Sequence, residues 1–156
     1  MVVLRHRRLL AALGALTAGL VAFVLLYFEP QKLFIDDEVH EAPPVATRVL
    51  SDGSFRSYEH ATSGRARVLQ LPDGRRSVRF DRFHTSNGPA LEVYLSAAAA
   101  TGPGDAFDNR YVNLGDLKGN IGEQNYAIPR YVDLARYRSV VVWCKRFSVP
   151  FGAAAL

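Results

Sequence analysis

The feature that most constrains this chain is an uncharged, mainly apolar run of twenty residues, Leu9 to Phe28. A helix rises about 1.5 Å per residue, so a helix of this length would span roughly the 30 Å hydrocarbon core of a bilayer. A buried core helix is the weaker interpretation, because a domain of the size that follows rarely hides so long an uncharged helix. The run therefore predicts one N-terminal transmembrane helix at residues 9–28.

The charges on either side of the run predict its orientation. Arg5, Arg7 and Arg8 precede it, and Glu29 and then the acidic group Asp36-Asp37-Glu38 follow it. Cytoplasmic flanks are enriched in Lys and Arg. We therefore expect residues 1–8 to lie in the cytoplasm and the C-terminal part of the chain to lie outside it, with the protein in the cell membrane as a single-pass protein.

A cleaved signal peptide is the alternative to a permanent anchor. The apolar run ends in Tyr27-Phe28-Glu29, without the small-x-small pattern that signal peptidase needs. The sequence therefore favours an uncleaved signal anchor, and residues 9–28 are the expected membrane contact.

Residues 29–52 differ in composition from what precedes and follows them. They contain three prolines and the acidic group, with few apolar residues. This predicts a tether, which would reach roughly 27 Å if it were disordered. The alternative is a partly ordered arm packed on the domain, with Leu33-Phe34-Ile35 as the docking segment.

Residues 53–156 are enough for one domain with one core. The clearest hairpin joins 66–71 to 77–83 through Pro72-Asp73-Gly74, with a bulge expected near Asp81-Arg82. Further strands are predicted at 90–95, 111–114, 124–128 and 140–149, and a short helical turn within 129–137. In the strand at 90–95, Glu92 and Tyr94 are expected on the outer face or under a second layer. Short strands with turns and no long helices predict an all-β fold, an antiparallel β-sandwich or a barrel-like domain.

The net charge of +4 includes three arginines of the predicted cytoplasmic end. Arginines of the outer domain alternate with apolar residues and aspartates, which is typical of solvated strand faces. We therefore expect no nucleic-acid partner.

The single thiol of the chain, Cys144, ends the strongly apolar run Val140 to Trp143. If the strand continues regularly to Val149, Cys144 is partly exposed, and Lys145 and Arg146 could stabilise a thiolate. If the strand bulges at Lys145, the thiol turns into the core and is an inert apolar group. Both arrangements remain open at this level, and Cys144 is the first candidate for redox chemistry.

Histidines at 60 and 84 could serve as a ligand opposite Cys144 or as a proton relay. Neither has a second ligand at metal-binding spacing, and hydrogen-bonded loop or strand-end histidines are the simpler interpretation. One Cys excludes the Cys-x-x-Cys-His haem attachment, and a four-ligand zinc site lacks soft ligands. No metal site is predicted.

Several ordered blocks carry a resemblance to a known family. They are His60-Ala61-Thr62-Ser63-Gly64, Asn87 to Leu95, Leu114 to Gly122, Gln124 to Pro129, Trp143-Cys144-Lys145 with Phe147-Ser148-Val149, and the terminal Phe151-Gly152-Ala153. Together these resemble the DM13 domain family over about two thirds of the chain.

This resemblance implies a compact all-β domain whose one family Cys takes part in electron transfer, as a bare thiol or by holding a group such as haem. Carried over to this chain, that role falls on Cys144, and His60 lies in a matching block as a second cofactor candidate. A redox protein outside the cytoplasm is then the expected partner, and an electron-transfer or accessory domain is favoured over a self-contained enzyme. The competing hypothesis is a non-catalytic binding or adhesion module in which Cys144 is structural.

Overall fold

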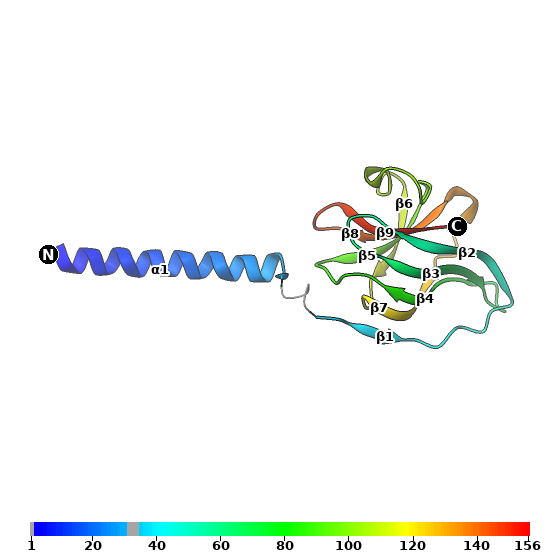
Figure 1. Cartoon of the computed structure of the whole chain (residues 1–156), viewed down its shortest axis with the longest axis horizontal. Coiled ribbons are helices and arrows are strands. Elements are labelled where there is room, and N and C mark those ends of the chain that lie inside the picture. The colour runs from blue at the N-terminus through cyan, green and yellow to red at the C-terminus, as the bar shows by residue number, and fades with distance from the viewer. Residues whose placement is uncertain (1, 31–34) are drawn as a thin grey trace.

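The computed structural model describes residues 2–30 and 35–156, and shows one long helix joined to a curled β-sheet domain (Figure 1). The elements are α1 Val2–Tyr27, β1 Glu38–His40, β2 Arg48–Ser57, β3 Ser63–Gln70, β4 Arg76–His84, β5 Leu91–Ser96, η2 Gly104–Ala106, β6 Tyr111–Asp116, β7 Ile121–Ile128, η3 Leu134–Arg136, β8 Ser139–Cys144 and β9 Val149–Ala155.

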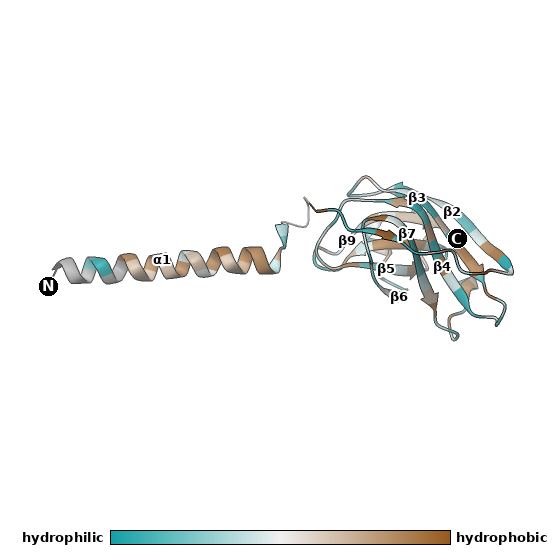
Figure 2. Ribbon diagram, turned by 90° about the horizontal axis from the view of Figure 1, so that it is seen from below, coloured by the Kyte–Doolittle hydropathy of each residue, from teal (hydrophilic) through white to brown (hydrophobic). Residues whose placement is uncertain are grey.

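Helix α1 extends away from the β domain, and the part of the helix nearer the domain is mainly apolar (Figure 2). The segment Leu10–Tyr27 has the length and composition of a membrane span, a property it shares with signal sequences. None of this segment is buried inside the structure. The predicted apolar helix is therefore present, and its apolar side chains have no protein cover.

The strands form one sheet in the order β1-β7-β4-β3-β2-β9-β8-β5-β6. Every neighbouring pair is antiparallel except β1 and β7. The sheet curls so that β6 approaches β7, which makes a half-barrel with its core inside the curl. The prediction of an all-β, barrel-like domain behind one apolar helix is confirmed.

The β3–β4 hairpin matches the sequence prediction. On its other edge, β4 pairs with β7, and the register of this pairing shifts between Phe80 and Phe83. Arg82 has φ of +47° at this point, so the expected bulge is present. The predicted helical turn is η3, where the Asp133 carboxylate accepts a hydrogen bond from the Ala135 N–H at 3.2 Å.

The prediction of one strand over 140–149 is wrong. The chain reverses in the turn 145–148, and β8 and β9 are neighbouring antiparallel strands. Ser148 has φ of +53°, a left-handed conformation that the apolar pattern did not signal. Strand β9 has a single β-branched residue, Val149, and its last four residues are one Gly and three Ala, which do not mark a strand in sequence.

Part of the predicted tether is ordered on the domain. Strand β2 begins at Arg48, and β1 pairs in parallel with β7 through Val39 opposite Gly122. Gly122 has φ of +104°, and a Cβ there would lie 2.1 Å from the Val39 carbonyl oxygen. The absence of a side chain at Gly122 therefore lets β1 lie against the sheet edge. Of the proposed docking segment, Leu33 and Phe34 lie outside the described residues.

Two apolar clusters lie on opposite faces of β5 and β8. The larger one fills the curl, and its buried residues include Val93, Val140, Val142 and Cys144. The smaller one lies outside the curl, beneath the loop 97–110, and includes Tyr94, Phe107 and Trp143. Every residue of β5 and β8 is buried for this reason. Of the two placements that the sequence left open for Tyr94, the outer face or under a second layer, the structure has the second.

Candidate functional site

Cys144 lies in the larger core cluster with 0% of its surface exposed. Its Sγ donates a hydrogen bond to the Pro89 carbonyl oxygen at 3.3 Å. Leu91 is its partner in the neighbouring strand β5. Of the two arrangements that the sequence left open, the buried one is present. The cause is the end of β8 at Cys144 and the turn that follows, since the strand pairing carries no bulge at Lys145.

The two basic neighbours of Cys144 point their charges elsewhere. The Lys145 Nζ lies 3.4 Å from Glu92 Oε1, and the Arg146 guanidinium lies over the Tyr27 ring at 4.6 Å from its centre. Their expected place beside an exposed thiolate depended on a regular strand that the structure does not have.

Arg146 also lines a polar cavity of 370 Å³ between the end of α1 and the sheet. Asp37, Asn87 and Asp116 contribute to the same cavity. The Arg146 Nη1 is buried and has no hydrogen-bond partner, which is true of no other buried side-chain nitrogen or oxygen among the described residues. Cys144 does not line this cavity, so the cavity does not connect the thiol to solvent.

His60 is half-buried, and its ring stacks on Phe151 with ring centres 3.8 Å apart. His84 is exposed at the end of β4. The Phe151 ring packs closely on Gly88, next to the residue that accepts the Cys144 hydrogen bond. His60 and Cys144 are therefore linked by a chain of contacts, from the His60 ring to Phe151, from Phe151 to Gly88, and from the Pro89 carbonyl to the thiol.

This arrangement does not fit a haem held by Cys144. A sulfur ligand must present an open face to iron, whereas the Cys144 Sγ is fully enclosed and hydrogen-bonded to backbone. The His60 ring is covered on one side by Phe151. In residues 2–30 and 35–156 no group of three or more His, Cys, Asp or Glu side chains is placed to hold a metal ion.

Threonine side chains join several of the distant sequence blocks at this end of the curl. The Thr62 hydroxyl lies 2.9 Å from that of Thr85 and donates to the Phe151 carbonyl at 3.0 Å. A Cβ at Gly152 would lie 2.5 Å from the Thr62 side chain, so that position must stay small. The blocks at 60–64, 87–91, 144 and 151–153 thus form one packed unit around the thiol.

The opposite face of β8 carries an aromatic stack that the sequence did not single out. Tyr94 lies between Trp143 and Tyr111, with ring centres 6.1 and 4.1 Å away. The Tyr94 hydroxyl donates to Glu92 Oε2 at 2.6 Å. The signal that could have found this pair is an acid and a Tyr two residues apart in a strand, since such residues share one face.

Burial raises the pKa of Tyr94 well above its ordinary value, and the hydrogen bond to Glu92 raises it further. Tyr94 is 2% exposed and Glu92 is 7% exposed, whereas Tyr111 is 42% exposed. The stack therefore runs from the buried strand β8 to the protein surface.

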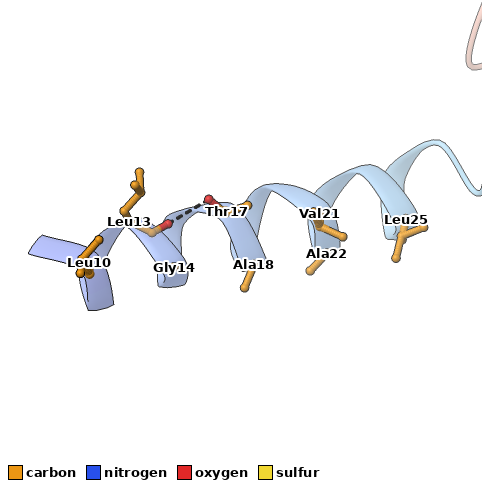
Figure 3. Close-up of a pocket in the computed structure, with 8 residues that line it drawn as sticks. All are labelled: Leu10, Leu13, Gly14, Thr17, Ala18, Val21, Ala22 and Leu25. Carbon is orange, nitrogen blue, oxygen red and sulfur yellow. Dashed lines mark hydrogen bonds between the residues drawn. The ribbon is translucent and has the colours of Figure 1, made fainter. Parts of the chain in front are cut away.

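Helix α1 has a shallow apolar groove along one side (Figure 3). Gly14, Ala18 and Ala22 recur at every fourth position along it. The Thr17 hydroxyl is turned back onto the Leu13 carbonyl at 2.9 Å. The groove therefore offers van der Waals surface and no polar group aimed at a ligand.

The fold and the site define a class: an all-β domain with one buried cysteine and an aromatic stack on the other face of the same strand. A family model described as "Electron transfer DM13" matches residues 54–156, which include every strand from β3 to β9. The chain belongs to the DM13 family. No curated protein and no solved structure matched the chain.

Proposed function

We propose that this protein is a membrane-anchored electron-transfer domain that works outside the cytoplasm, with Cys144 as a redox group. The observation that carries the proposal is the match of residues 54–156, most of the β domain, to an electron-transfer family. The expected partner is a redox protein of the same compartment. The helix α1 and the charges on its two sides support the anchoring and the orientation.

The burial of Cys144 limits how it can act. Thiol–disulfide exchange needs a sulfur that a partner sulfur can reach in line. The Cys144 Sγ offers no such access in the folded domain. Electron exchange without a covalent bond would take one electron from the Cys144 thiol to an oxidised partner. The S–H proton would have to leave to solvent when the domain opens locally, because the Pro89 carbonyl that accepts the hydrogen bond is too weak a base to take it.

Voltammetry of the full-length protein on an electrode tests this function. Wild-type protein should give a reversible current, and Cys144→Ala should remove the part of that current that belongs to the thiol while circular dichroism shows the fold unchanged. Val142→Ala, on the same face of β8, is the matched control for a small cavity in the same core. A wild-type protein without current would contradict the electron-transfer proposal.

Topology is tested separately. A phosphatase fused after Leu156 should be active, because that enzyme matures outside the cytoplasm, and a reporter that works in the cytoplasm should be silent. The reverse result would show that the β domain is cytoplasmic.

A non-catalytic binding or adhesion module is the second candidate, and the full burial of Cys144 in the apolar core favours it. In that case Cys144→Ala and Cys144→Ser leave partner binding intact, and the protein neither carries current nor shows a Soret band. The electrode measurement therefore separates the two functions.

A further inference from the structure

Two buried tyrosines of this domain have almost the same local geometry. Tyr94 on β5 donates its hydroxyl to Glu92 at 2.6 Å, and Tyr126 on β7 donates to Gln124 at 2.6 Å. In each case the acceptor lies two residues earlier on the same strand face. The difference is the acceptor: a carboxylate for Tyr94 and a neutral amide for Tyr126.

That difference decides whether the phenol has an acceptor for its proton when it loses an electron. A phenol that loses an electron becomes a very strong acid, so its proton must leave together with the electron. A carboxylate at hydrogen-bond distance can take this proton, whereas an amide oxygen is far too weak a base. Glu92 also has a cationic neighbour, because the Lys145 Nζ lies 3.4 Å from its Oε1.

The ring contacts give Tyr94 a route to the surface. Tyr94 and Tyr111 are stacked at 4.1 Å between ring centres with planes 17° apart. Tyr111 is partly exposed and can meet a partner directly. On the other side, the Tyr94 ring stacks with that of Trp143, which precedes Cys144 in the chain. Tyr126, in contrast, packs inside the curl against Phe80 at 5.3 Å.

We propose that Tyr94 is a redox-active tyrosine, with Glu92 as its proton acceptor and Tyr111 as its contact with a one-electron acceptor protein. In the forward step Tyr94 gives one electron, through the Tyr111 ring, to the acceptor, which is reduced by one electron. The Tyr94 O–H bond breaks, its proton bonds to Glu92 Oε2, and a neutral phenoxyl radical and a glutamic acid result. Return of one electron to Tyr94 reverses both changes.

The protonation of the resting state agrees with this step. A phenol with the ordinary pKa of about 10 is protonated at neutral pH, and burial raises the pKa of Tyr94 further. Oxidation must therefore move the proton and the electron together. The proposal rests on the electron-transfer function above, and assigns the path by which the electron reaches the surface.

The test is flash oxidation of the full-length protein in detergent micelles with a photoexcited ruthenium tris-bipyridine complex and an irreversible electron acceptor. Phenoxyl radical is followed by transient absorbance and by electron paramagnetic resonance. Wild-type protein should show a radical whose formation rate does not depend on buffer concentration, because its proton moves to Glu92. Exposed Tyr131, which is 82% exposed, serves as an internal standard whose oxidation depends on buffer base.

The variants then assign the signal. Tyr94→Phe should remove the buffer-independent radical, and Tyr126→Phe, the matched control, should leave it unchanged. Glu92→Gln should slow its formation by about 100-fold or more, the usual contribution of a positioned proton acceptor. Tyr94→Phe keeps the ring and its stacking, so it remains informative even where Glu92→Gln disturbs the fold.

A buffer-independent radical that survives Tyr94→Phe, or that Tyr126→Phe removes, would overturn the assignment. An unchanged rate in Glu92→Gln would overturn the role of Glu92. A protein that exchanges electrons at the electrode equally well with Phe at position 94 would refute this path alone. A wild-type protein that carries no current would refute the electron-transfer function itself.

Discussion

Tyr94 and Tyr126 have hydroxyl hydrogen bonds of the same length and acceptors at the same sequence spacing, but they lie in different parts of the domain. Tyr94 lies outside the curl of the sheet under a loop, and Tyr126 lies inside it. The strand period of two supplies the geometry in both cases. The residue two positions earlier, and the neighbouring rings, decide what chemistry that geometry allows.

The Gln124 side chain shows why Tyr126 is structural. Its Nε2 donates to the Gly119 carbonyl at 2.7 Å, while its Oε1 accepts from the Gly119 N–H and the Tyr126 hydroxyl. An amide can act as donor and acceptor at once, and a carboxylate cannot. Gln124 therefore closes the loop before β7, whereas Glu92 faces a hydroxyl and an ammonium group.

The largest expected effect concerns the packing on the Tyr94 side. Trp143→Ala should lower the free energy of unfolding by about 3 to 5 kcal/mol, because the indole is buried against Tyr94 and the site cannot fully collapse. Denaturant melts measure the loss, and the near-ultraviolet circular dichroism of the Tyr94 stack should weaken. A loss below about 1 kcal/mol would show that β8 is not a core strand.

Replacing each acceptor by the other residue type should lower the free energy of unfolding by very different amounts at the two sites. Gln124→Glu should cost about 3 kcal/mol or more, because it leaves the Gly119 carbonyl without a donor and buries a charge. Glu92→Gln should cost about 1 kcal/mol or less, because the amide oxygen still accepts from Tyr94 and the lost ion pair involves an exposed Lys145. Urea melts of both variants test this, and equal losses would remove the distinction between the two sites.

The two tyrosines should instead behave alike at high pH. Burial raises the pKa of both phenols above the ordinary value of about 10. The stability that these raised pKa values contribute is complete below about pH 10. It falls as the pH rises toward the folded-state pKa, because in that range the unfolded chain binds fewer protons than the folded chain. Each tyrosine should reduce the free energy of unfolding by about 1.4 kcal/mol per pH unit above about pH 10.

Tyr94→Phe and Tyr126→Phe should each lower that slope by the same amount in melts between about pH 10 and 12. Tyr131→Phe, at an exposed position, should leave it unchanged. A slope that only one of the buried tyrosines controls would mean that the other is already ionised or solvated in the folded state.

A small effect is also expected on the inner face of β8. Cys144→Ala should cost only about 1 kcal/mol, because a small apolar side chain replaces a small apolar one. The wild-type thiol should react with a maleimide only at the rate at which the domain opens. Rapid labelling of the native protein would show that Cys144 is reachable and would restore thiol–disulfide exchange as a mechanism.

Local sequence patterns were sufficient to predict several elements of the fold. The alternation in β3 and β4 with Pro72 and Gly74 between them predicted the hairpin, and the misplaced Phe83 predicted the bulge. Short-range sterics and the strand period control both features. The turn after Cys144 was not predictable in the same way, because neither Gly nor Pro marks the residues 145–148.

The sequence by itself determined that an apolar helix precedes an all-β domain, that the domain has the DM13 blocks, and that one thiol ends an apolar strand. Apolar run length, strand period and motif order are properties of the chain and need no contacts. The tertiary structure alone decided that Cys144 is enclosed and that its basic neighbours turn to Glu92 and Tyr27. It also brought Tyr111, Tyr94 and Trp143 into one stack, because strands β6, β5 and β8 are neighbours in the sheet although they are distant in the chain.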